Sequence, residues 1–233
     1  MTSHRYSVYF APSSGSALWR LASAWLGRDA ATGMRPERPL VAGVAPSTIA
    51  AMTEEPARYG FHATLKAPFR LERSATGQDL LDAVERFAGT RRPVAVPEMT
   101  VNTIGNFVAL APATPPPGLP ELAAACVEVF DPFRAPMEQA ELDRRRRAPL
   151  TPREDELLRR WGYPYVMDAF RFHMTLTGPL AEPDRAGIRQ ALAALFEPLT
   201  ARPVVIDALT VFDQPRPGAP FRIAARFPFA GGA

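Results

Sequence analysis

Two hydrophobic periodicities alternate along the chain, and together they predict a mixed α+β fold. Alternation of apolar and polar positions indicates short strands, and apolar residues three and four apart indicate amphipathic helices. The expected strands lie at 5–10, 92–101, 107–110, 202–211 and 221–227, and the expected helices at about 13–27, 77–89, 122–130 and 184–196. A further helix is expected to begin at Thr151, where Pro152 and Glu154 complete a capping box. Residues 28–56 are weakly patterned, with only a short helix expected at 47–52.

One phrase, Phe-His-x-Thr-Leu-x-x-Pro, occurs twice, at 61–68 and at 172–179. The repeat extends further, because Arg-Pro-Val occurs at 92–94 and 202–204, and Thr-Val at 100–101 and 210–211. This order predicts one domain, 1–233, with two similar lobes related by a pseudo-twofold axis and facing each other across a central cleft. The repeat units span about 59–111 and 170–228. A charged insertion at about 131–160 has no counterpart in the first unit and is interpreted as a lid or a dimer surface.

The phrase carries the candidate chemistry. If each copy is a strand, alternate side chains share a face. One polar face then holds His62, Thr64 and Lys66, and the other holds Arg171, His173 and Thr175. Two imidazoles in one cleft can serve as base and acid near neutral pH, and the hydroxyls can bind phosphate oxygens.

Other polar and aromatic residues are candidates for the cleft, and each also has an ordinary structural or solvent-exposed role as an alternative. Lys66 and Arg171 would add positive charge beside the histidines, although Lys66 also suits an exposed strand end. Tyr9 and Arg5 would line the cleft if the first strand borders it. The run 144–147, four arginines, is either a solvated helix face or an edge that attracts anions. Trp161, Tyr163 and Tyr165 are expected to pack, with stacking on a nucleobase as the minor alternative.

Composition narrows the setting. The 233 residues are 47% hydrophobic with a net charge of +3, which fits a globular protein with an anionic substrate better than a protein that coats DNA. The single cysteine, Cys126, forms no intrachain disulfide and favours a reducing compartment. The N-terminus does not resemble a signal peptide, and no apolar stretch reaches the length of a membrane span. A cytoplasmic protein without membrane partners is therefore expected.

The wording around both phrases resembles a known superfamily. The segments Arg-Tyr-Gly-Phe-His-Ala-Thr-Leu-Lys-Ala-Pro-Phe (58–69), Trp-Gly-Tyr-Pro-Tyr-Val (161–166) and Phe-Arg-Phe-His-Met-Thr-Leu-Thr-Gly (170–178) resemble the 2H phosphoesterases, which include LigT-like RNA 2′,3′-cyclic phosphodiesterases. They are most similar to a bacterial branch associated with phosphonate metabolism. The resemblance implies a bilobed fold with a central cleft and metal-independent chemistry at a phosphodiester. It assigns His62 and His173 as the acid–base pair, and Thr64 and Thr175 as phosphate-binding hydroxyls.

The leading hypothesis is therefore a metal-independent phosphoesterase without a cofactor. Its expected substrate is a small cyclic nucleotide or sugar phosphate, or an RNA end. The alternative is a module that binds an RNA end or a cyclic nucleotide without turnover. A third hypothesis, a hydrolase with a metal held by two histidines and a carboxylate, is weak, because the nearest acid, Asp168, stands at no standard ligand spacing.

Overall fold

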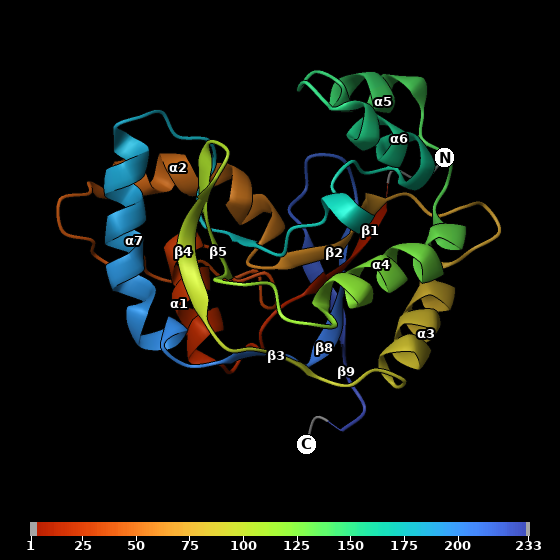
Figure 1. Ribbon diagram of the computed structural model, residues 1–233, viewed down its shortest axis with the longest axis horizontal. Helices are drawn as coiled ribbons and strands as arrows, with labels where there is room; N and C mark the ends of the chain where they lie inside the picture. Colours follow the sequence, from red (N-terminus) through yellow and green to blue (C-terminus); the bar gives the residue numbers. More distant parts are fainter. Residues whose placement is uncertain (1–3, 232–233) are drawn as a thin grey trace.

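Seven strands form one antiparallel sheet in the computed structural model, which describes residues 4–231 (Figure 1). Their order across the sheet is β4 (Met99–Ile104), β5 (Phe107–Pro112), β6 (Met174–Thr175), β2 (Ala63–Phe69), β1 (Arg5–Phe10), β8 (Ala208–Gln214) and β9 (Arg222–Pro228). Two short strands, β3 (Val94–Val96) and β7 (Val204–Ile206), form a separate pair. The predicted α+β class is confirmed. The expectation that the chain has no signal peptide rests on its first residues, of which 1–3 lie outside the described residues.

The two phrases meet inside the sheet, and the pairing there follows the sequence repeat. Ala63 of β2 pairs with Met174 of β6, and these residues directly follow the two histidines of the phrases. Ala95 of β3 likewise pairs with Val205 of β7, 110 residues later in the chain. Equivalent residues of the two repeats thus lie opposite each other at both places, as an approximate twofold axis requires.

The sheet shows how the two repeats are joined, which the sequence repeat did not predict. β5, from the first repeat, pairs with β6, from the second, through Ala109 and Thr175. β8, from the second repeat, pairs with β1, which in turn pairs with β2 of the first. The hairpins of the repeats therefore extend a shared sheet, whose narrowest joint is the single β2–β6 pair.

Seven α-helices surround the sheet in residues 4–231. They are α1 (Ala17–Leu26), α2 (Pro46–Tyr59), α3 (Gly77–Ala88), α4 (Leu119–Phe130), α5 (Gln139–Arg145), α6 (Pro152–Trp161) and α7 (Asp184–Thr200). α1, α2 and α7 lie around the β4–β5 end, α3 and α4 lie near the other end, and α5 and α6 project together from one corner (Figure 1). None of these helices is both long and apolar enough to span a bilayer.

Local sequence explains most helix boundaries. The predicted capping box of α6 is present, with Thr151 and Glu154 each bonding the backbone of the other. α2 runs to Tyr59, well past the expected end near residue 52, and its buried stripe continues to Pro56. Proline is a poor helix former, so its presence on the buried face concealed the last turn of α2. That turn matters because it ends at Gly60, two residues before the first histidine.

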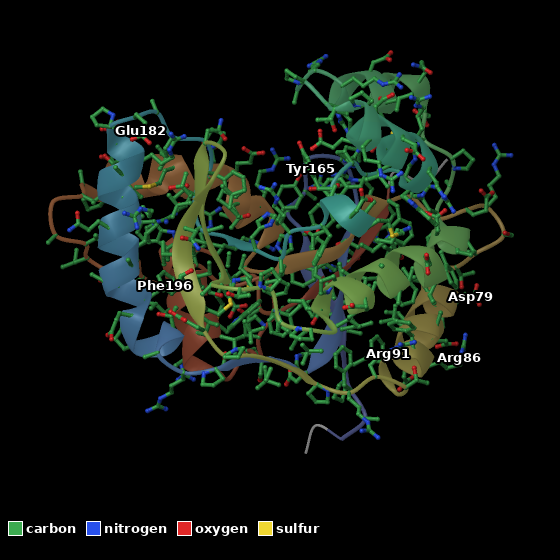
Figure 2. All side chains as sticks on the ribbon, in the orientation of Figure 1. Asp79, Arg86, Arg91, Tyr165, Glu182 and Phe196 are labelled. Atoms are coloured by element: carbon green, nitrogen blue, oxygen red, sulfur yellow. The ribbon has the colours of Figure 1, made fainter. Side chains whose placement is uncertain are left out.

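The core fills the space between the sheet and its helices. Phe196 of α7 is fully buried, whereas Asp79 and Arg86 of α3 point outward at the periphery (Figure 2). Trp25 of α1 is also buried, and its indole Nε1 donates to the carbonyl of Leu176 at 2.8 Å, which ties α1 to the second phrase. Cys126 is buried and free, as its place in an apolar helix suggested, and burial raises the pKa of its thiol.

Candidate functional site

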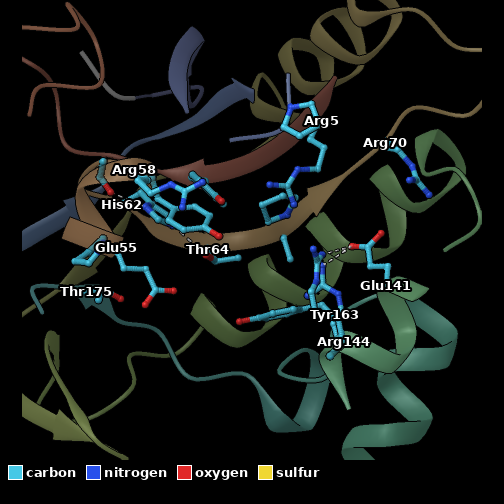
Figure 3. Close-up of a pocket in the computed structure, with 18 of the residues that line it drawn as sticks. Arg5, Glu55, Arg58, His62, Thr64, Arg70, Glu141, Arg144, Tyr163 and Thr175 are labelled. Carbon is cyan, nitrogen blue, oxygen red and sulfur yellow. Dashed lines mark hydrogen bonds and ion pairs between the residues drawn. The ribbon is translucent and has the colours of Figure 1, made fainter. Parts of the chain in front are cut away.

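One cleft, with a volume of about 840 Å³, brings parts of both phrases together (Figure 3). His62 and Thr64 line it from the first phrase, and His173 and Thr175 line it from the second. Thr64 lies in β2 and Thr175 in β6, whereas each histidine stands one residue before its strand, so the second phrase is a strand at only two residues and not along its length as expected. The extended backbone still places residues i and i+2 on one face. The structure therefore assembles the histidine–threonine pairs that the sequence predicts as one site.

The two imidazoles are held in the same way. His62 Nδ1 donates to the carbonyl of Gly60 at 2.8 Å, and His173 Nδ1 donates to the carbonyl of Arg171 at 2.8 Å. A carbonyl only accepts, so Nδ1 carries the proton in both rings and Nε2 keeps a lone pair. The Thr64 hydroxyl lies 3.2 Å from Nε2 of His62 and can donate to that lone pair. Each ring is thus oriented to accept a proton at Nε2.

Burial makes both histidines bases at neutral pH. Burial is the main reason that the pKa of His62 falls from 6.5 to about 4; the nearby His173 acts in the same direction, and the hydrogen bond to the Gly60 carbonyl opposes them. Burial also lowers the pKa of His173. The empty cleft therefore holds two neutral imidazoles, and a bound anion would favour protonation of one of them.

Tyr9 borders the cleft, as the alternation of β1 predicts. Its ring is buried and stacks on His62, with centroids 3.8 Å apart and planes 19° apart. Phe212 packs behind Tyr9, with a centroid distance of 5.0 Å. The imidazole of His62 is therefore fixed by an aromatic face as well as by its hydrogen bonds.

Lys66 does not lie in the cleft, which corrects the face assigned to it. Tyr9 pairs with Thr64 and Val8 pairs with Lys66, so one residue of β2, Leu65, has no counterpart in β1. This bulge reverses the alternation, so that Lys66 shares the buried side of Val8. Its ammonium group is 2.9 Å from the Val127 carbonyl and 2.7 Å from Asp131 Oδ1, and the side chain is almost fully buried.

The Arg171 guanidinium is also absent from the cleft lining. The residue is exposed, and only its carbonyl contacts His173. Its side chain lies toward α6, where Thr151 and, to a smaller extent, Arg171 hold the pKa of Glu154 below its usual value. The expectation that Arg171 contacts phosphate is not supported by this placement.

Asp168, the carboxylate considered for the two-histidine metal hypothesis, does not line the cleft. Asp168 forms an ion pair with Arg153 at 2.7 Å, and both side chains are exposed. Among residues 4–231, no three histidine, cysteine or acidic side chains are grouped as a metal site would require.

Five arginines line the cleft, and two of them, Arg58 and Arg70, were missed in the sequence as site residues. They are Arg5, Arg58, Arg70, Arg144 and Arg145. Arg58 stands at the start of the first phrase, but its position next to His62 depends on the end of α2 (Figure 3). The charged insertion contributes one wall through α5, with Glu138 and Glu141 beside the arginines. The cleft is therefore rich in guanidinium groups along much of its length.

Comparisons with known proteins identify relatives but correct the predicted activity. Residues 64–222 match the family described as "Protein of unknown function (DUF1045)". The chain is 39% identical over 97% of its length to Ribose 1,5-bisphosphate phosphokinase PhnN of Janthinobacterium sp. (strain Marseille). It is 38% identical over 94% of its length to the protein of the same name from Laribacter hongkongensis (strain HLHK9). The chain spans about half the length of these curated relatives, 51% and 50% respectively.

The relatives are named as a kinase, which contradicts the predicted metal-independent phosphodiesterase and its alternative, a non-catalytic binder of RNA ends or cyclic nucleotides. The error arose because paired histidines and threonines indicate acid–base chemistry and phosphate binding. Several different reactions of phosphate esters need these groups, so the pairs do not identify the reaction. The family match covers more than half of the sequence, from the first phrase to the last strand. This chain therefore belongs to the DUF1045 family.

Proposed function

We propose that this chain binds a phosphorylated ribose in the cleft and acts on it as part of a phosphoryl-transfer enzyme. The observation that carries the proposal is the pair of neutral imidazoles, His62 and His173, in one arginine-lined cleft. Guanidinium groups suit phosphate oxygens, and an imidazole with a free Nε2 suits a hydroxyl proton. The proposal includes a place in phosphonate metabolism, which the family resemblance implies, and a cytoplasmic setting, which the single cysteine favours.

The proposed chemistry uses one histidine at each end of the transfer. The Thr64 hydroxyl stabilises the neutral form of His62, so His62 is assigned as the base. It accepts the proton of the sugar hydroxyl as the new O–P bond forms. The donor's P–O bond breaks with its electron pair on the leaving oxygen, which takes a proton from His173 once anion binding has protonated that ring. Thr64 and Thr175 then donate to the phosphoryl oxygens.

The sugar is assigned from the relatives' printed name, which specifies ribose 1,5-bisphosphate. A P-loop lysine would be needed for the usual grip on a nucleoside triphosphate. Lys66 is the only lysine of the sequence, and its ammonium group is bound to Asp131. We therefore assign the sugar phosphate to this cleft, and the donor is expected to place only its terminal phosphoryl group between the histidines, without a P-loop contact.

Binding is tested by isothermal titration calorimetry with ribose 5-phosphate. The wild-type chain should bind, and the variant with both His62→Gln and His173→Gln should bind roughly tenfold or more weakly, because two hydrogen-bonding groups are lost. The control is His4→Gln, since His4 lies outside the cleft and contacts Asp213. Absence of binding to the wild type at millimolar concentrations would refute the proposal.

Transfer is tested by phosphorus NMR of ribose 1,5-bisphosphate with ATP and the wild-type chain. A new phosphate-ester signal that is lost in His62→Gln, with a rate decrease of roughly 10²–10⁴-fold, is expected. A bound sugar phosphate with an unchanged spectrum would reject the catalytic part of the proposal and leave binding alone.

A further inference from the structure

The cleft has a second end, away from the histidines, that is formed by the charged insertion. Figure 3 shows His62 and Thr175 on one side of the cleft, Arg144, Glu141 and Tyr163 on the other, and Arg5 between them. We propose that this second end is a phosphate subsite, so that the cleft takes a ribose phosphorylated at two positions. The inference rests on the proposed function, which places a ribose phosphate beside the two histidines.

Arg145 is the central group of the proposed subsite. Its side chain is only 18% exposed, and its Nε–H is buried without an acceptor among the described residues. The guanidinium lies over the ring of Tyr163 at 5.6 Å from the centroid, which helps to hold its orientation. A buried N–H without an acceptor lowers the stability of the fold. An anionic ligand that accepted from Nε of Arg145 would remove this cost, which favours binding.

Two more arginines extend the subsite. Arg5 is held by Gln214, which accepts from Nε at 2.8 Å, and by the ring of Phe221 at 5.4 Å. Burial lowers the pKa of Arg5, and the charges of Glu141 and Arg144 also act on it, so these groups are close together. A phosphate would meet the partly desolvated and already oriented guanidinium groups of Arg5 and Arg145, whereas the Arg144 side chain is 59% exposed and adds charge at the rim.

Glu141 occupies the position of an internal counter-ion. Its Oε1 lies 3.1 Å from Arg145 Nη2 and 3.7 Å from Arg144 Nη2. Three guanidinium groups, those of Arg5, Arg144 and Arg145, thus face one carboxylate. A phosphate dianion would balance the remaining charge and provide acceptors that the single carboxylate lacks.

The arginines of the run 144–147 have separate tasks, which argues against a purely solvated helix face. Arg146 pairs with Asp155 at 2.7 Å and joins α5 to α6. Arg70 pairs with Glu138 at 2.9 Å and joins α5 to the chain after β2. α5 is thus anchored by other pairs, while Arg144 and Arg145 line the cleft. Arg147 does not line it and provides a matched control.

The test compares ribose 5-phosphate with ribose 1,5-bisphosphate by titration calorimetry. Wild type and Arg147→Gln should bind the bisphosphate roughly 10- to 100-fold more tightly than the monophosphate, as expected for charge-assisted hydrogen bonds. Arg145→Gln should lose most of this preference and keep its affinity for the monophosphate. Glu141→Gln should increase the preference, because the competing carboxylate is removed. Circular dichroism and thermal unfolding establish that each variant is folded.

The outcomes separate the two proposals. If neither sugar binds to the wild type, the proposed function is wrong. If the monophosphate binds through the histidines but the bisphosphate binds no more tightly, the second subsite is wrong and the proposed function stands. Equal weakening of both ligands in folded Arg145→Gln, or a lower bisphosphate preference in Glu141→Gln, would also overturn the subsite.

Discussion

Tyr9 stacks on His62, with ring centroids 3.8 Å apart and planes 19° apart. The tyrosine covers one face of the imidazole, and the Gly60 carbonyl holds its Nδ1–H. The aromatic cover removes water that would otherwise stabilise the protonated ring, so burial lowers the pKa of His62 to about 4. This one contact therefore connects the packing of β1 with the protonation state of the candidate base.

The low pKa of His62 predicts a loss of stability in acid. The folded state disfavours the charged ring, so its contribution is complete above pH 6.5 and disappears as the pH falls toward 4. The free energy of unfolding of the wild type should fall over this interval by about 1–3 kcal/mol more than that of His62→Gln. Urea unfolding at several pH values measures both curves. Parallel curves would show that the His62 pKa is not depressed.

Removal of the aromatic cover should raise the pKa of His62. In Tyr9→Leu, water reaches the imidazole and the pKa moves toward its usual value. The chain has only three histidines, so NMR titration can follow each ring. Tyr6→Leu is the matched control, because Tyr6 stacks on His4, with centroids 4.4 Å apart, and should leave the His62 titration unchanged. An unaltered His62 titration in Tyr9→Leu would contradict the assigned cause.

Gly60→Ala should damage both the fold and the site. Gly60 has φ +80° and ψ 174°, a conformation that is essentially restricted to glycine, and an added Cβ would lie 2.5 Å from the Cβ of Ala30. A loss of about 1–3 kcal/mol in stability is expected from the backbone strain alone. Affinity for ribose 5-phosphate should also fall, because the Gly60 carbonyl orients His62.

Gly33→Ala serves as the control for that variant. Gly33 also has a positive φ, +76°, but an added Cβ would meet nothing within 4 Å. Strain should therefore lower its stability without a change in sugar-phosphate affinity. Thermal unfolding and calorimetry measure the two effects, and equal affinity losses in both variants would rule out a specific role for the Gly60 carbonyl.

Lys66→Met tests the corrected place of the lysine. The substitution removes the contacts to the Val127 carbonyl and to Asp131, while Arg134 still pairs with Asp131 at 2.8 Å. Stability should fall by about 1–3 kcal/mol because a buried carbonyl loses its donor. Affinity for ribose 5-phosphate should stay unchanged. If the folded variant bound ribose 5-phosphate clearly more weakly, Lys66 would contribute to the cleft and the corrected placement would be wrong.

The sequence was informative where an interaction follows from neighbouring positions in one strand. Period-two alternation predicts that His62 and Thr64 share a face, and both line the cleft. The same reasoning failed two residues later, at Lys66, because β2 contains an extra residue relative to β1. A bulge depends on how two strands pair, so the sequence of β2 alone does not reveal it.

The sequence did not predict that α5 forms a wall of the cleft, because this also depends on how distant segments pack. The four arginines at 144–147 look alike in sequence, and only the packing of α5 against α6 assigns Arg146 to Asp155 and Arg145 to the cleft. The shared sheet was also missed, because a repeat shows which segments are equivalent but not which of them pair. β5 pairs with β6, which is distant in the chain, and such a pairing depends on the tertiary fold rather than on either sequence alone.

The twofold relation between the phrases does not by itself determine the orientation in which a ligand binds. Two histidine–threonine units that are equivalent in sequence, one on each side of the Ala63–Met174 pair, offer a ligand the same residue types after a half turn. A symmetric site would thus bind a molecule in either of two opposite orientations. Helix α5 comes from a segment that occurs once in the chain and stands at one end of the cleft. Its presence makes the two orientations unequal, so a single unrepeated helix can decide which end of a substrate meets the histidines.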